Sequence, residues 1–276
     1  MKKISVLLFA CLFIISSPEA QVKPKSLKQV SILKMPRTAD DDMPGKRGAC
    51  VVWHPKQKKY YAAMAGNAGF PVAVFDATGK MLSSDDDDVL IDVRGLWYNA
   101  DKNRIEGNGF DDVGWFYYKL DEKGQITDYE VLFEGLNQPD EQTVGAYNYK
   151  DNKILFLKGS QVYTYNITDA KATGDELTIH WGRTEKEGAT KEEDTLQTPD
   201  EYNRTTVVYS DLSEAELGVL NITKLQVEFY NIKNGFMTQV LTLPENTIVE
   251  NAFNFAYANG IIWLFDIDAR TWSGYK

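Results

Sequence analysis

One short phrase recurs along this chain and limits its fold more than any other feature. Residues 72–75 have the alternating side-chain pattern of a strand, and this run ends at Asp76 in a turn that contains Gly79. Alternation followed by Asp and Gly is typical of a β-strand that ends in a tight turn. In the later copies the turn residue is Asp121, Asn166 or Asn231. The intervals between copies are therefore 45, 45 and 65 residues.

This period predicts the architecture. Repeats of about 40–50 residues with several strands each are typical of a β-propeller, in which antiparallel sheets stand around a central axis. One more interval of 45 residues from Asn231 reaches residue 276. We therefore predict an all-β protein, a five-bladed β-propeller of four-stranded antiparallel blades, formed by residues 49–276.

Two irregularities in the strand pattern, one at each end of the chain, have the same explanation. A strand expected at 27–33 lies outside the five copies, and the fifth copy, from Phe253 onward, has three expected strands instead of four. If 27–33 supplies the outer strand of the last blade, the ring closes and no long sheet edge stays open. The alternative is an open β-sandwich with a frayed N-terminus.

Individual strands can also be placed within the copies. The first copy should end with a fourth strand somewhere in 80–91, and the third copy with one at 177–181. The interval of 65 residues contains 20 extra residues, which fall at about 182–203. That stretch is polar, mixed in charge and without period, so we expect a long exposed loop.

The N-terminal residues resemble an export signal. A basic start is followed by an apolar run at 4–15 and by small residues up to Ala20, the pattern of a secretory signal peptide. The run is shorter than the roughly 20 residues of a membrane span. We predict a signal peptide at 1–20, a leader at 21–48 that holds the closing strand and a loop, and a periplasmic or secreted bacterial protein.

Charge narrows the range of partners. The chain has a net charge of −10, and loss of the signal peptide would remove two Lys and one Glu. Nucleic acids and anionic membrane surfaces select basic patches. We therefore expect no nucleic-acid partner and no membrane insertion, and a monomer that binds a small molecule, a glycan or a protein.

Cysteine and histidine are scarce in the mature chain. Cys50 is the one cysteine beyond the signal peptide, and it starts an apolar strand, so we expect a buried, inert thiol. His54 and His180 are the only histidines. This set excludes a structural zinc site. We expect His54, in the first turn, to be a surface histidine rather than a catalytic one.

Two motifs resemble known propeller repeats. Residues 74–80 and 120–124 resemble the hairpin of NHL-type repeats. Residues 53–60, with an aromatic residue, a proline and a lysine at set spacing, resemble a turn of WD-like and TolB-like blades. Together these resemblances extend over most of residues 49–276 and imply the propeller fold. They assign no particular family.

A third resemblance concerns chemistry. Five-bladed furanosidases and related glycoside hydrolases have an Asp-Pro dipeptide before a paired tyrosine strand, and this chain has His54-Pro55 before Tyr60-Tyr61. The resemblance would imply glycoside hydrolysis, which needs two carboxylates on either side of one bond. His54 stands where that family has its carboxylate base. The repeat brings no pair of acids together in its place.

Propellers suggest where a ligand would bind. The loops that join a fourth strand to the next first strand share one face with the loops between second and third strands, and loops on a rigid scaffold often carry function. We predict ligand-binding residues on this face, and we expect the tyrosines and tryptophans to form core. The candidates are Asn67, Asp92, Arg94, Asn108, Asp111, Asp112, Asn137 and Asp140.

Two of these loops contain clustered oxygens. The run 85–88 has four adjacent aspartates, and 108–112 combines Asn, Gly and two Asp. Calcium takes six to eight oxygen ligands, but the aspartate run lacks the spacing of a calcium loop. We favour solvated turns and predict no metal and no other cofactor, with calcium as the alternative. Asp92 and Arg94 should form a local ion pair, and capture of an anion by Arg94 is the alternative.

These observations lead to two functional hypotheses. The first is a binding module that recognises a small ligand, a glycan or a protein partner on the loop face. The second is a hydrolase or lactonase-like enzyme that uses carboxylates at the channel mouth, with or without calcium. The sequence favours the first, because no pair of acids is forced together.

Overall fold

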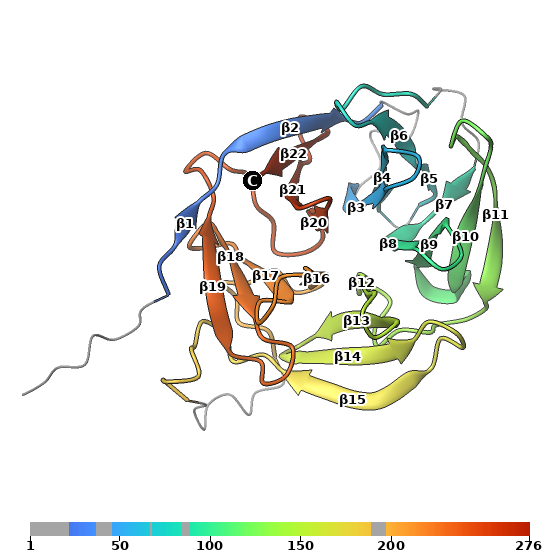
Figure 1. The fold of residues 1–276 in the computed structure, drawn as a ribbon. Coiled ribbons are helices and arrows are strands. Elements are labelled where there is room, and N and C mark those ends of the chain that lie inside the picture. The colour runs from blue at the N-terminus through green and yellow to red at the C-terminus, as the bar shows by residue number, and fades with distance from the viewer. Residues whose placement is uncertain (1–21, 37–45, 67, 84–88, 189–196) are drawn as a thin grey trace, which may run out of the picture.

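The computed structural model describes residues 22–36, 46–66, 68–83, 89–188 and 197–276. The described residues form five β-sheets around a central axis and a separate two-stranded ribbon (Figure 1), which confirms the predicted five-bladed β-propeller. The predicted signal peptide lies outside the described residues. No helix of the described residues has the length and apolar character needed to cross a membrane.

Blades 2 and 3 have four antiparallel strands each, as predicted. Blade 2 contains β8 (Val93–Asn99), β9 (Arg104–Gly109), β10 (Trp115–Leu120) and β11 (Ile126–Phe133). Blade 3 contains β12 (Ala146–Asn148), β13 (Lys153–Lys158), β14 (Gln161–Asn166) and β15 (Ala172–Thr178).

The predicted position of the last strand of blade 3 is wrong. The expected strand was 177–181, but β15 ends at Thr178, which lies opposite Gln161 in the sheet. The chain then passes to the next blade, where the backbone amide of His180 donates to Gly235. The first part of β15 is largely exposed and polar, so it carries little apolar alternation to mark it as a strand.

Blade 1 is shorter than the other blades. It consists of β3 (Arg47–His54), β4 (Lys59–Ala65) and β6 (Ala73–Asp76). Of the fourth strand expected in 80–91, the described residues contain one bridge between Met81 and Phe75. In addition, β7 (Leu90–Ile91) pairs with β5 (Phe70–Pro71) as a separate ribbon. The amide of Leu82 also donates to the carbonyl of Val74, so a short fourth-strand pairing is present at the start of the expected range, and residues 84–88 of that range lie outside the described residues.

Blades 4 and 5 complete the ring. Blade 4 contains β16 (Val208–Tyr209), β17 (Leu217–Asn221), β18 (Gln226–Tyr230) and β19 (Met237–Thr242). Blade 5 contains β20 (Phe255–Ala258), β21 (Ile261–Asp266) and β22 (Thr271–Tyr275). The predicted insertion lies between β15 and β16, and residues 189–196 of it are outside the described residues.

The N-terminal segment closes the ring, as predicted. Strand β2 (Gln29–Lys34) pairs antiparallel with β22 and forms the outer strand of blade 5 (Figure 1). Within this pair Leu33 lies opposite Trp272, and both side chains are fully buried. Strand β1 (Lys25–Ser26) pairs parallel with β19, so the same short segment also extends blade 4.

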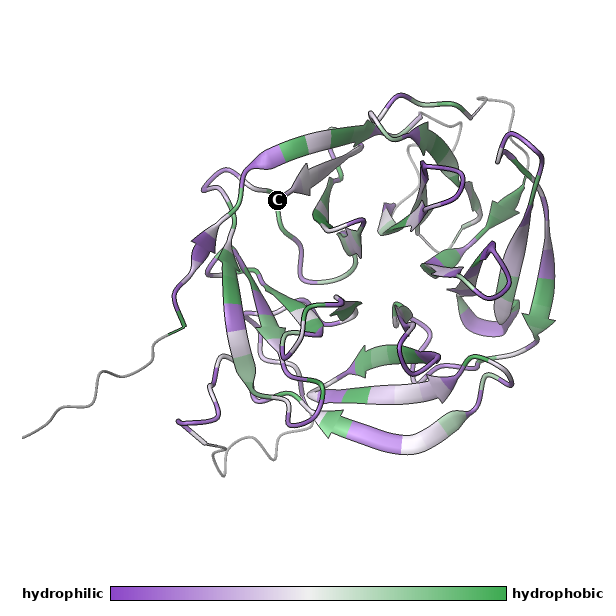
Figure 2. Ribbon diagram, in the orientation of Figure 1, coloured by the Kyte–Doolittle hydropathy of each residue, from purple (hydrophilic) through white to green (hydrophobic). Residues whose placement is uncertain are grey.

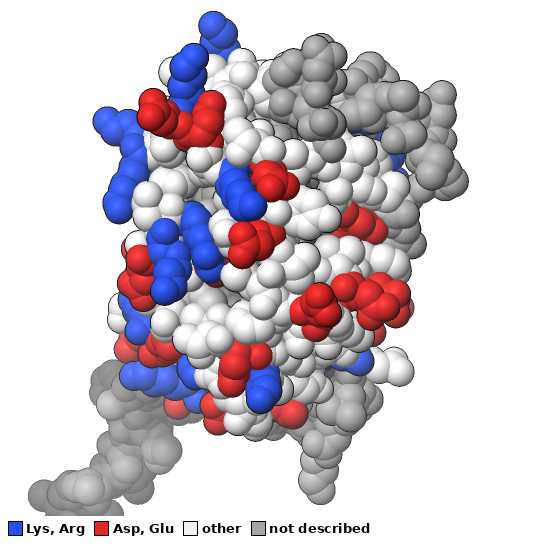
Figure 3. Space-filling view, turned by 90° about the vertical axis from the view of Figure 1, so that its right-hand side faces the viewer, with Lys and Arg blue, Asp and Glu red and all other residues white. Residues whose placement is uncertain are grey.

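The core lies between the blades. Hydrophobic residues predominate in the inner strands, while the outer strands β15 and β19 are mixed (Figure 2). Trp115, Trp263 and Trp272 are fully buried, as expected for core aromatics. Basic and acidic side chains lie close together on the side of the molecule drawn in Figure 3. In blade 2, the amine of Lys119 forms an ion pair with Asp128 at 3.1 Å. Exposed pairs of this kind contribute little to stability.

Candidate functional site

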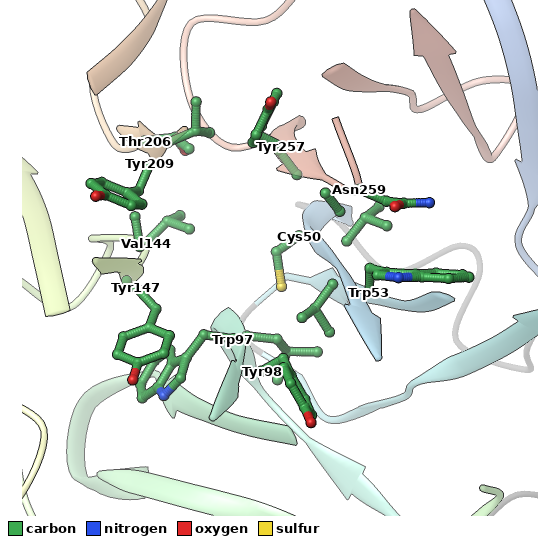
Figure 4. Close-up of a pocket in the computed structure, with 18 of the residues that line it drawn as sticks. Cys50, Trp53, Trp97, Tyr98, Val144, Tyr147, Thr206, Tyr209, Tyr257 and Asn259 are labelled. Carbon is green, nitrogen blue, oxygen red and sulfur yellow. The ribbon is translucent and has the colours of Figure 1, made fainter. Parts of the chain in front are cut away.

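The first strands of the five blades surround an axial cavity of about 490 Å³ (Figure 4). Buried Cys50, Val144 and Thr206 line its inner part, while exposed Asp211 and Asn259 lie at its mouth. The mouth therefore opens on the face that carries the turns between first and second strands. This is the opposite face from the one on which we predicted ligand binding.

One aromatic side chain comes from the same position of each blade. In blade 2, Tyr98 pairs with Ile105 and directly precedes the pair of Asn99 with Arg104 that closes the hairpin. The corresponding residue of each other first strand is also aromatic and also lines the cavity. Figure 4 shows them arranged around the axis: Trp53, Tyr98, Tyr147, Tyr209 and Tyr257.

In four of the five blades, the residue after the aromatic stabilises the turn that follows. In blades 1 to 4 this residue is His54, Asn99, Asn148 or Ser210, and all four are buried. Each side chain accepts a hydrogen bond from a backbone amide of the turn that follows. Such side-chain bonds to the backbone stabilise turns. The turns, and with them the aromatic positions, are thereby fixed by the fold.

The expectation of a surface histidine at position 54 is wrong. His54 is 1% exposed, and its ring lies 4.6 Å from that of Tyr98 in the neighbouring blade. Its Nδ1 accepts from the amide of Gln57 at 3.3 Å. Burial lowers the pKa of His54 below its ordinary value of 6.5, because removal from water penalises the charged ring.

A buried carboxylate fixes a second aromatic residue in the cavity wall. The indole Nε1 of Trp97 donates to Glu106 at 3.1 Å, and Glu106 is 2% exposed. The same carboxylate accepts from Asn99 at 3.0 Å and from Arg104 at 2.7 Å. Glu106 is not among the residues that line the cavity, so its part in the site is to position Trp97.

The cavity carries very little charge. Asp211 is the single charged residue among the described residues that line it, and it lies beside Tyr149 at the mouth. The ring of Tyr149 meets that of Tyr209 edge-on, with centroids 5.7 Å apart. The pKa of Tyr149 is raised by burial, and further by the negative charge of Asp211 and a hydrogen bond to its carboxylate.

Cys50 lies in the wall of the cavity, and its burial confirms the prediction. Figure 4 shows its sulfur directed into the cavity from β3. Burial raises the pKa of the thiol well above its ordinary value. A protonated thiol is a poor nucleophile, so Cys50 contributes to the cavity as a small apolar side chain.

On the opposite face, several predicted site residues contact other protein groups. These contacts stabilise the fold and do not form a binding site. Arg94 is fully buried, donates to Asp92 and to the carbonyl of Glu141, and lies over the ring of Phe110 at 4.5 Å. Burial raises the pKa of the Asp92 carboxyl above its usual range despite this pairing. The local ion pair is therefore present.

Asn108 joins blades 2 and 3. Its amide nitrogen donates to Gln138 at 2.7 Å and to the carbonyl of Thr143 at 3.0 Å. Its amide oxygen accepts from the backbone of Gly145 at 3.1 Å. The side chain is fully buried, so all its hydrogen bonds go to protein groups that hold the first strand of blade 3.

The remaining candidates do not form a site. Asn137 donates to carbonyls of its own turn, and Asp140 lies 3.6 Å from the amine of Lys158. Asp111 and Asp112 are exposed in the short 3-10 helix η1 (Asp111–Val113). The ranges that the structure describes contain no group of three His, Cys, Asp or Glu that could hold a metal ion. Asn67 and the run 85–88 lie outside the described residues.

The circle of five aromatic side chains was not predicted from the sequence, although the pattern that would predict it is present there. The pairs Trp53-His54, Tyr98-Asn99, Tyr147-Asn148, Tyr209-Ser210 and Tyr257-Ala258 each end a first strand. Aligning the copies on these pairs, instead of on the turn at Asp76, would have placed an aromatic residue at one common position at the end of each first strand.

Fold and cavity together define a five-bladed β-propeller with an aromatic axial cavity. No family model matches the chain, and no curated protein matches it either. Among solved structures, it is similar to the crystal structure of Myxococcus xanthus glutaminyl cyclase, with a TM-score of 0.53 and 10% sequence identity. The match covers 92% of this chain and 98% of that one. At this identity the likeness shows the fold alone.

Proposed function

We propose that this protein is a binding module that takes a small organic molecule into its axial cavity. The observation that carries the proposal is the aromatic residue at the same position of all five blades, which in each blade lines one cavity of about 490 Å³. Small-molecule sites are typically concave, of about 300–1,000 Å³, mostly apolar and aromatic, with few polar groups.

The lining supports binding of a ligand with flat or methylated apolar faces. Tyrosine and tryptophan offer large rigid surfaces together with a polar group that can hydrogen-bond. Thr206 and Asn259 add further polar groups at different depths of the cavity. A small molecule or a single sugar unit fits this chemistry better than a protein surface, because the aromatic side chains lie around a cavity and not on an exposed patch.

The hydrolase alternative has less support. A mechanism with two carboxylates needs both acids at one bond, and Asp211 is alone among the described lining residues. Glu106, a buried acid that is hydrogen-bonded to the lining residue Trp97, accepts from three side-chain donors. The likeness to a glutaminyl cyclase gives a precedent for an enzyme on such a ring, but it transfers no residue role. We also propose that the protein acts after export, on the pattern of residues 1–20.

The test is a ligand screen that reports on the cavity. Small molecules, including monosaccharides and organic cations, are added to the protein while tryptophan emission is recorded, because Trp53 and Trp97 line the cavity. Hits should bind the Tyr209→Ala variant at least about tenfold more weakly, the scale of one lost aromatic contact. They should bind the Tyr129→Ala variant unchanged, since Tyr129 is exposed on the outer strand β11. Equal binding to both variants would place the ligand elsewhere.

A further inference from the structure

We propose that the mouth of the axial cavity binds the ammonium group of an organic cation, at a subsite formed by Tyr149, Tyr209, Tyr257 and Asp211. The inference rests on the proposed function and deepens it by naming the ligand class. It predicts that a methylated or otherwise substituted ammonium is preferred over a neutral molecule of the same shape.

The aromatic part of the subsite comes from three consecutive blades. Tyr149 follows β12, Tyr209 ends β16 and Tyr257 lies in β20, and all three line the cavity. The rings of Tyr149 and Tyr209 are perpendicular, at an interplanar angle of 89°. Aromatic faces carry negative partial charge and attract a cation within about 6 Å of the ring centre, and several rings around one point form the cages that hold quaternary ammonium groups.

Asp211 supplies the full negative charge that an aromatic cage lacks. It is the single charged side chain among the described lining residues, so the cavity has a net charge of −1. The described Lys and Arg residues form no ion pair with its carboxylate; the amine of Lys150 donates to its backbone carbonyl instead, at 3.2 Å. Burial is the main cause of the raised pKa values of Tyr149 and Tyr257, and the negative charge of Asp211 raises both further.

The same residues argue against other charged ligands. An anion would meet the carboxylate and the negative ring faces without a cationic partner in the lining. An inorganic cation such as calcium needs six or more oxygens, and the described residues offer one carboxylate there. An organic ammonium is the class for which apolar rings and a single carboxylate are both favourable.

The experiment compares two probes of equal shape on the full chain. Choline carries a quaternary nitrogen, and 3,3-dimethyl-1-butanol has a carbon in its place. We expect choline to change the emission of the cavity tryptophans saturably, with a dissociation constant at least about tenfold lower than that of the neutral alcohol. This preference should decrease in high salt, because charge attraction is screened.

Two variants and a control locate the effect. Asp211→Asn should abolish most of the preference for choline while leaving the neutral alcohol unaffected. Tyr209→Leu should weaken the binding of both probes, and that of choline more, because it removes apolar contact area together with a negative ring face. Glu214→Gln changes an exposed acid of the same turn that does not line the cavity, and it should bind choline like the parent protein. Asp211 is exposed, so its substitution should not impair folding, which a melting curve checks.

The outcomes separate this inference from the proposed function. If both probes bind with equal affinity, the cavity binds small molecules but the ammonium subsite is wrong. If choline does not bind while other molecules of the screen bind and depend on Tyr209, the subsite is again wrong and the proposed function stands. If choline binds Asp211→Asn as tightly as the parent, the assignment of the carboxylate is overturned.

Discussion

The guanidinium carbon of Arg94 lies 5.4 Å from the ring centroid of Phe253, although the two residues belong to blades 2 and 5, which are not neighbours in the ring. Both side chains are buried. Arg94 lies at the start of β8 and Phe253 just before β20, so the contact lies at the face where first strands begin, the face on which we had predicted ligand binding. The cavity is left with its mouth at the other end, among the tyrosines.

The closing strand should contribute measurably to stability. Leu33 of β2 is fully buried opposite Trp272, whereas its neighbour Ile32 is 51% exposed. Replacing Leu33 with Ala should lower the free energy of unfolding by about 2–5 kcal/mol, the cost of removing a buried leucine side chain. The matched change Ile32→Ala should cost about 0.5 kcal/mol or less. Urea denaturation measures both, and equal effects would contradict burial of β2 against blade 5.

Asn108 should behave as a structural residue. Asn108→Ala removes three buried hydrogen bonds and leaves the partners in Gln138, Thr143 and Gly145 unsatisfied. We expect a loss of about 2–4 kcal/mol in unfolding free energy. Asn137→Ala, which alters bonds within a surface turn, should cost about 1 kcal/mol or less. If Asn108→Ala were fully stable but impaired in ligand binding, our original assignment of Asn108 to a binding site would be restored.

His54 should make stability depend on pH. Its pKa is lowered by burial in the folded protein, whereas the unfolded chain has the ordinary value of 6.5. As pH falls through 6.5, the unfolded chain takes up a proton that the folded protein does not bind, so the free energy of unfolding decreases. The loss continues down to the folded pKa. Above pH 7.5 this effect should be absent.

The variant His54→Asn isolates this effect. Asn occupies the same position in blades 2 and 3, where Asn99 and Asn148 accept the turn hydrogen bond, so the turn should persist. The difference in unfolding free energy between parent and variant should shift in favour of the variant as pH falls from 7.5 to 5. Denaturation curves at several pH values measure this difference, and a constant difference across that range would rule out His54 as its source.

The two aspartates of η1 should not bind a metal ion. Asp111 and Asp112 are exposed, so replacing both with Asn should change the unfolding free energy by about 0.5 kcal/mol or less. Added calcium should leave the melting temperature of the parent protein unchanged. A rise with calcium in the parent, absent from the double variant, would establish a calcium site that we do not expect.

The period of the turn residues was enough to predict the ring, because every blade needs the same hairpin. The turns at Asp76, Asp121, Asn166 and Asn231 do follow the third strand of blades 1 to 4. Closure by the N-terminal strand was also predictable, since a missing strand at one end matched an extra one at the other. Both predictions depend on the number and spacing of strands along the chain, and these do not depend on how the side chains pack.

Side-chain environment was harder to predict. His54 sits in a turn, and turns are usually exposed, but Tyr98 of the next blade covers it. Arginine and asparagine are common in binding sites, but Arg94 and Asn108 are fully buried and hydrogen-bond to other groups of the protein. Whether a polar loop side chain is exposed or buried depends on its contacts with the neighbouring blade. The sequence of one repeat gives no information on those contacts.

The pairing of β2 with β22 also sets a time order for the making of the protein. Leu33 and Trp272 are 239 residues apart, and ribosomes add about 5–20 residues per second. For roughly 10–50 seconds of synthesis, the first strand of the ring has no partner, while the hairpins of blades 2 and 3 can already form. The last residue that lines the cavity is Gly260, so the whole lining is made before Trp272, but a chain interrupted between these two residues would lack the strand that closes the ring around it.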